Sequence, residues 1–110
     1  ACRVLAALEA GYEDRRRQVF LRTRDLSESG VYLLSHDPPD VGSQAEIHLE
    51  LPGCPAILRL RGTVIRRETG GTSGFALLFD EASNEAALCE LRQYVTQIAS
   101  REATEGARGG

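Results

Sequence analysis

Hydrophobic and polar residues alternate with a period of two along most of the chain before residue 80. In AEIHLEL (residues 45–51) the alanine, isoleucine and leucines fall on one face, and the glutamates and the histidine fall on the other. This alternation is typical of a β-strand with one buried face. It predicts six strands, at about residues 4–10, 17–23, 31–35, 45–51, 57–67 and 75–80. The residues expected to face the core in the last three strands are Ala45, Ile47, Leu49, Leu51, Leu58, Leu60, Gly62, Val64, Phe75, Leu77 and Phe79.

Clusters of glycine and proline separate these strands. Residues 36–42 (HDPPDVG), 52–55 (PGCP) and 68–74 (ETGGTSG) are predicted turns, because proline fixes φ and glycine permits positive φ. The first two strands are expected to join around residues 11–14. Short strands with a turn about every eight to twelve residues indicate an all-β fold, here a small six-stranded antiparallel barrel.

The period changes to that of a helix near the end of the chain. Residues 83–100 place Leu88, Leu91, Val95 and Ile98 on one helical stripe. Ser83 is the predicted N-cap, so we expect a C-terminal helix that closes or flanks the barrel. Residues 102–110 are polar and glycine-rich, and they are expected to form a flexible tail or linker after a domain of residues 1–101.

Composition and net charge narrow the range of possible functions. The net charge of −3 argues against broad binding to nucleic acid, although all 13 cationic side chains are arginine, which suits phosphate and guanine. No apolar run is long enough to span a bilayer and no signal peptide opens the chain, so we expect a cytoplasmic domain. The chain contains no methionine, and we therefore expect it to be a piece of a longer protein.

The cysteines predict neither disulfides nor a metal site. There are three, Cys2, Cys54 and Cys89, and none forms a CxxC pair. A zinc site that joins them to His36 and His48 would draw its ligands from scattered positions. We expect the thiols to be small buried apolar residues, and we expect no metal or cofactor.

The hexapeptide DLSESG (residues 25–30) has two interpretations. Aspartate and serine side chains often accept hydrogen bonds from backbone amides two residues on, and glycine is common in left-handed turn positions. It could therefore be only a hairpin turn. Alternatively, Asp25, Ser27 and the backbone of Gly30 are presented to a ligand.

The surrounding motifs resemble those of the PilZ domain family. In that family a D/N-x-S-x-x-G motif ends the second strand of a six-stranded barrel, a later strand carries G-x-V-x-R, and the next begins G-F with a further phenylalanine. The resemblance runs over about residues 3–100. The matching residues are Asp25, Ser27 and Gly30, then Gly62, Val64 and Arg66, then Gly74, Phe75 and Phe79.

This resemblance implies a receptor for the bacterial second messenger cyclic di-GMP. Asp25 would accept hydrogen bonds from the N1–H and N2–H edge of a guanine. Ser27 would donate to a phosphate or accept from a base, and Gly30 would let the backbone approach the ligand closely.

One family motif is missing from the chain. Ligand-binding members carry R-x-x-x-R before the first strand, yet no two arginines here are four positions apart. In one account Arg3 is the second arginine of the pair and the first precedes residue 1. In the other the pair is absent and the domain is a protein-binding adaptor. A variant of the second account lets the run Arg15–Arg17 supply replacement charge, although such a run is usually a solvated surface.

Other functions have less support. Catalysis would need a nucleophile with its base, and no nucleophile elbow or phosphate loop accompanies Ser27, Ser29, His36 or His48. Single-stranded nucleic acid would need an aromatic stacking platform, and the chain has three Phe and three Tyr. We therefore expect a non-catalytic domain that relays cyclic di-GMP binding to a neighbouring domain or protein partner. As an adaptor it would contact a motility or polymer-secretion protein through its final helix or through Arg59, Arg61 and Arg66.

Overall fold

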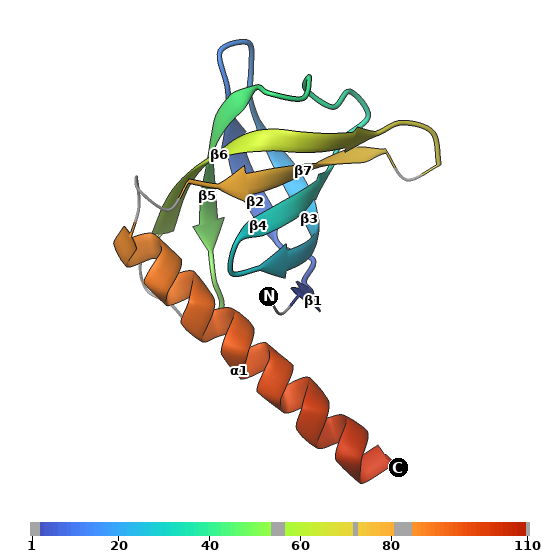
Figure 1. Cartoon of the computed structure of the whole chain (residues 1–110), viewed down its shortest axis with the longest axis vertical. Helices are drawn as coiled ribbons and strands as arrows, with labels where there is room; N and C mark the ends of the chain where they lie inside the picture. Colours follow the sequence, from blue (N-terminus) through green and yellow to red (C-terminus); the bar gives the residue numbers. More distant parts are fainter. Residues whose placement is uncertain (1–2, 54–56, 72, 81–84, 110) are drawn as a thin grey trace.

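The chain folds into a β-barrel flanked by one long helix (Figure 1). The structure is a computed structural model and describes residues 3–53, 57–71, 73–80 and 85–109. In this part of the chain the strands are β1 (Arg3–Leu5), β2 (Glu9–Glu13), β3 (Gln18–Ser27), β4 (Gly30–Leu34), β5 (Gln44–Glu50), β6 (Ile57–Glu68) and β7 (Gly74–Phe79). The helix is α1 (Glu85–Gly109).

Six of these strands close the barrel, and every pairing is antiparallel. The order β2–β3–β4–β7–β6–β5 returns to β2, because β2 pairs with both β3 and β5. The short β1 adds to β3 beyond the end of β2, on the same edge. The predicted six-stranded antiparallel barrel with a C-terminal helix is therefore confirmed.

The N-terminal strand differs from its prediction because it is interrupted. The predicted strand 4–10 is divided into β1 and β2, and Thr23 of β3 bridges the gap between them. Its hydroxyl donates to the carbonyl of Ala6 and accepts from Leu8 N at 2.8 Å, and its own N–H donates to Leu8 O at 2.8 Å. Buried backbone groups need partners, and Thr23 supplies them for Ala6 O and for the N–H and carbonyl of Leu8.

The barrel interior follows the predicted alternation. All eleven residues expected to face the core are buried in the structure. Tyr12 adds an edge-to-face contact with Phe75, the ring centroids lying 5.4 Å apart. Leu88, Leu91 and Val95 bury the apolar stripe of α1 against the barrel, and Ile98 is half-buried.

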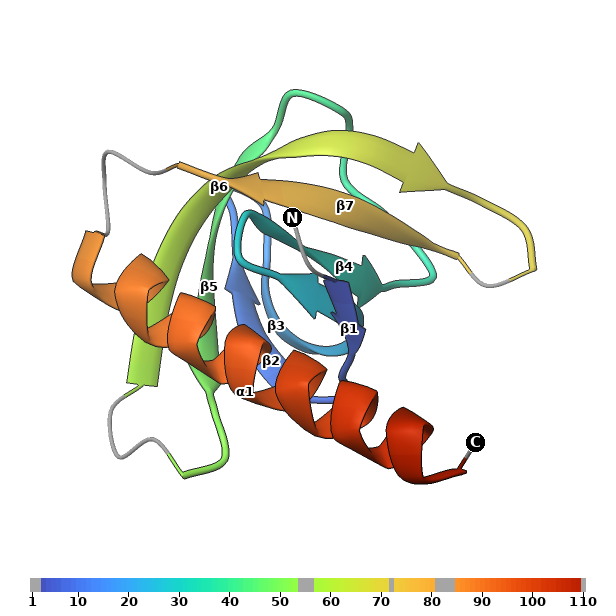
Figure 2. The same ribbon diagram turned by 60° about the horizontal axis from the view of Figure 1, so that its bottom comes forward.

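The helix is longer than predicted. It was expected over residues 83–100, and it continues to Gly109, through most of the segment for which a tail was expected. Glutamate, alanine and arginine are good helix formers, and they outweigh Gly106 in the interior of this part of the helix. The predicted cap Ser83 lies outside the described residues. The C-terminal half of α1 projects past the strands in both views (Figures 1 and 2).

Two further predictions can be compared with the structure. Cys89 was expected to be buried, and it is exposed on α1, off the apolar stripe that packs on the barrel. Cys2 and Cys54 lie outside the described residues. Among the described residues no helix has the length and apolarity that crossing a membrane requires.

The hairpin between β2 and β3 turns at residues 14–17, not at the predicted 11–14. Asp14 Oδ1 accepts from the N–H groups of Arg16 and Arg17 at 2.8 and 2.9 Å, and Asp14 Oδ2 accepts from the Tyr12 hydroxyl at 2.6 Å. Burial disfavours the ionised carboxylate of Asp14 and so acts to raise its pKa, but these hydrogen bonds outweigh burial and hold the pKa below its ordinary value. The pKa of Tyr12 is raised by burial and by its hydrogen bond to Asp14.

Asp14→Asn should therefore destabilise the fold by about 1–2 kcal/mol at pH 7. Because the folded pKa of Asp14 lies below its unfolded value, its stabilisation is present above about pH 4 and disappears as the pH falls through the folded pKa. Urea unfolding at several pH values checks this, with the exposed Asp37→Asn as control. The difference between wild type and Asp14→Asn should shrink as the pH falls below about 4. A difference that is independent of pH would contradict the assignment.

Candidate functional site

The candidate site lies at the turn between β3 and β4, on the outer face of the barrel. The Ser27 hydroxyl accepts from Gly30 N at 3.0 Å and from Ser29 N at 3.3 Å, and it lies 3.3 Å from the carbonyl oxygen of Gly30. Ser27 is buried. The residue therefore shapes the turn, as the simpler of the two interpretations of DLSESG predicts.

Gly30 was expected either to adopt a left-handed turn conformation or to let the backbone approach a ligand closely. Its φ is not positive, so the left-handed interpretation is wrong. An ideal Cβ at this position would lie 2.5 Å from the carbonyl oxygen of Leu77 in β7. The backbone does come close at Gly30, and what it approaches in this structure is the neighbouring strand.

The other motif glycines show the same close approach. A Cβ at Gly62 would lie 2.4 Å from the carbonyl oxygen of Leu78, and one at Gly74 would lie 2.4 Å from that of Leu33. Real Cβ atoms do not approach backbone oxygens so closely. All three glycines therefore allow adjacent strands to pass each other tightly around β7.

Asp25 is buried on the outer face, where Arg24 covers it. The residue is 4% exposed, and Arg24 Nε lies 3.0 Å from Asp25 Oδ2. Neighbouring strand residues normally point to opposite faces, but a bulge between Thr23 and Asp25 inserts Arg24 as an extra residue. The bulge explains how Arg24 reaches the carboxylate of the residue that follows it.

Arg24 also lies over an aromatic ring. Its guanidinium carbon is 3.7 Å from the centroid of Tyr32, which lies directly opposite Asp25 in the β3–β4 register. Tyr32 is 2% exposed, and its hydroxyl donates to Glu68 Oε2 at 2.9 Å. Burial and this hydrogen bond raise the pKa of Tyr32. Arg66 lies farther from the ring, at 6.0 Å, and 3.5 Å from Glu68.

Sequence reasoning missed Arg24, Tyr32 and Glu68 as part of this site. A signal was present, because alternation places Tyr32 on the face opposite to the core residues Val31 and Leu33. An aromatic residue that faces outward beside a motif aspartate is a candidate contact. The pairing of Tyr32 with Asp25 could not be derived, since it depends on the register and the bulge.

The structure brings the four predicted site residues into one neighbourhood. Arg3 in β1 lies directly opposite Ser27 in the β1–β3 register, and Leu5 lies opposite Asp25. Gly30 follows Ser27 across the turn. The run Arg15–Arg17 instead lies at the other end of β3, where Arg17 donates to the carbonyl of Asp37 at 2.7 Å. These three arginines are therefore poorly placed to replace a missing arginine beside Asp25.

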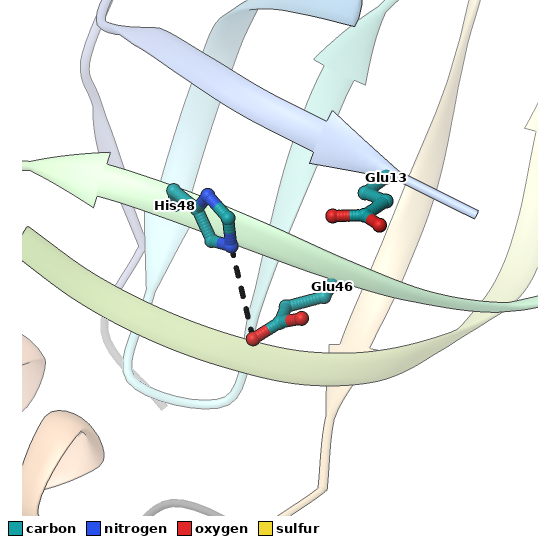
Figure 3. Close-up of side chains that lie close together, drawn as sticks. All are labelled: Glu13, Glu46 and His48. Atoms are coloured by element: carbon teal, nitrogen blue, oxygen red, sulfur yellow. Dashed lines mark ion pairs between the residues drawn. The ribbon is translucent and has the colours of Figure 1, made fainter. Parts of the chain in front are cut away.

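Hollows and possible metal ligands lie elsewhere on the barrel. A hollow of about 410 Å³ borders Glu13, Glu46, Arg61 and Thr63 and does not include Asp25 or Ser27. Beside it, ligand atoms of Glu13, Glu46 and His48 lie within 4.8 Å of one another (Figure 3). Such a set suits a divalent cation such as zinc, and the structure places His48 beside two glutamates. Arg61 lies opposite Glu46 in the β5–β6 register. Its guanidinium is therefore an alternative to a metal ion as the cation beside the Glu46 carboxylate.

Comparison with known proteins identifies the fold family. The model of the PilZ domain matches residues 2–97. No curated protein matches the chain. The similar solved structures described next are only 12–18% identical in sequence to this chain, so they show a shared fold and nothing about function.

Three solved structures illustrate the likeness. The Bacillus subtilis inhibitor of motility, MotI/DgrA, has a TM-score of 0.75 at 15% identity, covering 91% of this chain and 50% of that one. The PilZ domain of CeSA from a cellulose-synthesizing bacterium has a TM-score of 0.69 at 18% identity, covering 90% and 99%. The Borreliella burgdorferi PlzA protein, solved in complex with c-di-GMP, has a TM-score of 0.64 at 12% identity, covering 84% and 38%. The chain thus spans half of MotI/DgrA and less of PlzA.

Proposed function

Because this chain belongs to the PilZ domain family, whose members are cyclic di-GMP receptors or adaptors, we propose that it binds cyclic di-GMP beside the β3–β4 turn. The observation that carries this proposal is the β1–β3 register. It sets Arg3 opposite Ser27, two residues from Asp25 along β3. The register thus puts an arginine and an aspartate on neighbouring strands, and these two residue types suit a ligand that has both phosphates and guanines.

Each residue has a distinct part in the proposed site. The Asp25 carboxylate accepts from guanine N1–H and N2–H in a charge-assisted pair. The guanidinium of Arg3 suits phosphate oxygens or guanine O6 and N7. Ser27 holds the turn, and its hydroxyl would donate to a phosphate or accept from a base. A second arginine from before residue 1 completes the grip in this account.

The proposed output is mechanical. β1 contacts both β3 and α1, so a ligand that binds Arg3 together with Asp25 acts on the strand that touches the helix. Among the similar proteins, one is an inhibitor of motility and one was solved in complex with c-di-GMP. We propose a non-catalytic effector domain of a larger bacterial protein, acting in the cytoplasm on a neighbouring domain or a partner.

A second candidate is a protein-binding adaptor that does not bind the nucleotide. Its support is that Asp25 and Ser27 already have partners within the chain, and that no two arginines are four apart. In this account the motif residues only build the barrel. The exposed Arg59 and Arg61, and the projecting end of α1, then offer surfaces to a partner protein.

Thermal unfolding with two nucleotides distinguishes these functions. Cyclic di-GMP at about 100 times its Kd should stabilise the fold by about 2.7 kcal/mol, and the melting temperature should rise. Cyclic di-AMP should leave it unchanged, because adenine lacks the N1–H and N2–H donors that Asp25 accepts. Equal shifts with both nucleotides would contradict the role of Asp25. No shift with either, in folded full-length protein, would favour the adaptor.

A further inference from the structure

We propose that Arg24 acts as an internal competitor of the ligand. In the free domain the Arg24 guanidinium pairs with the Asp25 carboxylate and covers the ring of Tyr32. When the ligand binds, one of its guanine bases takes over both contacts. Tyr32 then becomes the stacking platform for that base. This inference rests on the proposed binding of cyclic di-GMP and adds two residues, with opposite effects on affinity, to the site.

The first argument is chemical similarity. A guanidinium and the N1–H, N2–H edge of guanine are both flat groups with N–H donors on one side, and both suit a carboxylate and an aromatic face. Arg24 makes both contacts at once, with Nε 3.0 Å from Asp25 and its guanidinium carbon 3.7 Å from the Tyr32 centroid. Arg24 therefore already contacts both groups that would recognise guanine, the Asp25 carboxylate and the Tyr32 ring.

The second argument is the layering of the site. Asp25 and Tyr32 are 4% and 2% exposed, whereas the side chain of Arg24 is 36% exposed. Arg24 is thus the outer layer over two groups that the ligand must reach.

The third argument is that Tyr32, the proposed stacking platform, is held rigidly, whereas Arg24, which covers it, can move. Tyr32 is fixed by its hydrogen bond to Glu68, and a Cβ at Gly74 would lie 2.6 Å from its ring. Arg24 is a long side chain from a bulge residue, and it can turn outward without any change in the barrel. After displacement its charge remains near the ligand phosphates, so the exchange removes a competitor and keeps the electrostatic attraction.

Arg24→Lys is the variant that separates competition from charge. Lysine keeps the positive charge, but it lacks the flat guanidinium that stacks on Tyr32 and presents several N–H donors to a carboxylate. Losing a partly exposed cation–π contact should make the protein bind cyclic di-GMP about three- to tenfold more tightly. Arg22→Lys is the matched control, because Arg22 is exposed on the same strand and lies opposite Glu9 and Leu34, away from Asp25.

Titration calorimetry of cyclic di-GMP into the product of the whole reading frame tests the inference. We expect tighter binding by Arg24→Lys, unchanged binding by Arg22→Lys, and at least tenfold weaker binding by Tyr32→Leu. If Tyr32→Leu fails to fold, the two lysine variants decide. Binding by wild type that Arg24→Lys leaves equal or weaker would overturn the competitor role while the proposed function stands. No binding by wild type or by any variant would remove the proposed function, and the inference with it.

Discussion

Asp25→Asn should weaken cyclic di-GMP binding by about 10- to 100-fold, the cost of a hydrogen-bond pair to a charged acceptor. Asparagine has nearly the same shape but replaces one acceptor oxygen by an N–H₂ donor. That donor would face the N1–H or N2–H donor of guanine. Calorimetric titration of both proteins measures the ratio of the two dissociation constants.

A matched control separates this effect from a general loss of negative charge. Asp40 is an exposed carboxylate that also pairs with an arginine, since Arg67 Nη1 lies 3.0 Å from Asp40 Oδ1. Asp40→Asn should leave the affinity within about twofold, because exposed ion pairs contribute little. Equal losses from both substitutions, or no loss from Asp25→Asn in folded protein, would contradict the site.

Gly30→Ala should destabilise the barrel by about 1–3 kcal/mol, because its methyl group has no space. The new Cβ would lie 2.5 Å from the carbonyl oxygen of Leu77, and β4 and β7 must separate to admit it. Since Leu77 is a core residue of β7, the separation also disturbs the packing beneath it. Urea unfolding of wild type and variant measures the change in the free energy of unfolding.

Gly11→Ala is the control for this prediction. Gly11 also lies inside a strand, but a Cβ there would meet His48 Cβ at an ordinary 3.4 Å. We expect a change within about 0.5 kcal/mol, with the better strand tolerance of alanine offsetting the contact. If the two variants lost equal stability, the close approach of β7 would not be the reason for glycine at position 30.

The sequence was sufficient for most of the fold, because the barrel has one buried face and strand alternation reports that face directly. Ala45 to Leu51 and Leu58 to Val64 alternate without exception, and the structure buries the expected side. The interruption between β1 and β2 was not predictable in this way. It depends on the Thr23 side chain reaching Ala6 and Leu8 on another strand, a tertiary contact that no local pattern encodes.

The candidate site was predictable only in part. The motif residues Asp25, Ser27 and Gly30 could be located from spacing, and Arg3 from its place before the first strand. The partners of Asp25 could not, because Arg24 reaches it through a bulge and Tyr32 meets it through cross-strand register. The reason for Gly30 was also hidden, since its neighbour Leu77 is far along the chain.

The most direct test of the proposed function is titration of cyclic di-GMP into the 110-residue chain and into the product of the whole reading frame that encodes it. We predict binding at micromolar concentration or tighter by the full product. The 110-residue chain should bind more weakly, because Arg3 is then the single arginine beside Ser27 and Asp25 that the β1–β3 register supplies. An absence of heat from both proteins, with each shown to be folded by circular dichroism, would contradict the receptor and leave the adaptor.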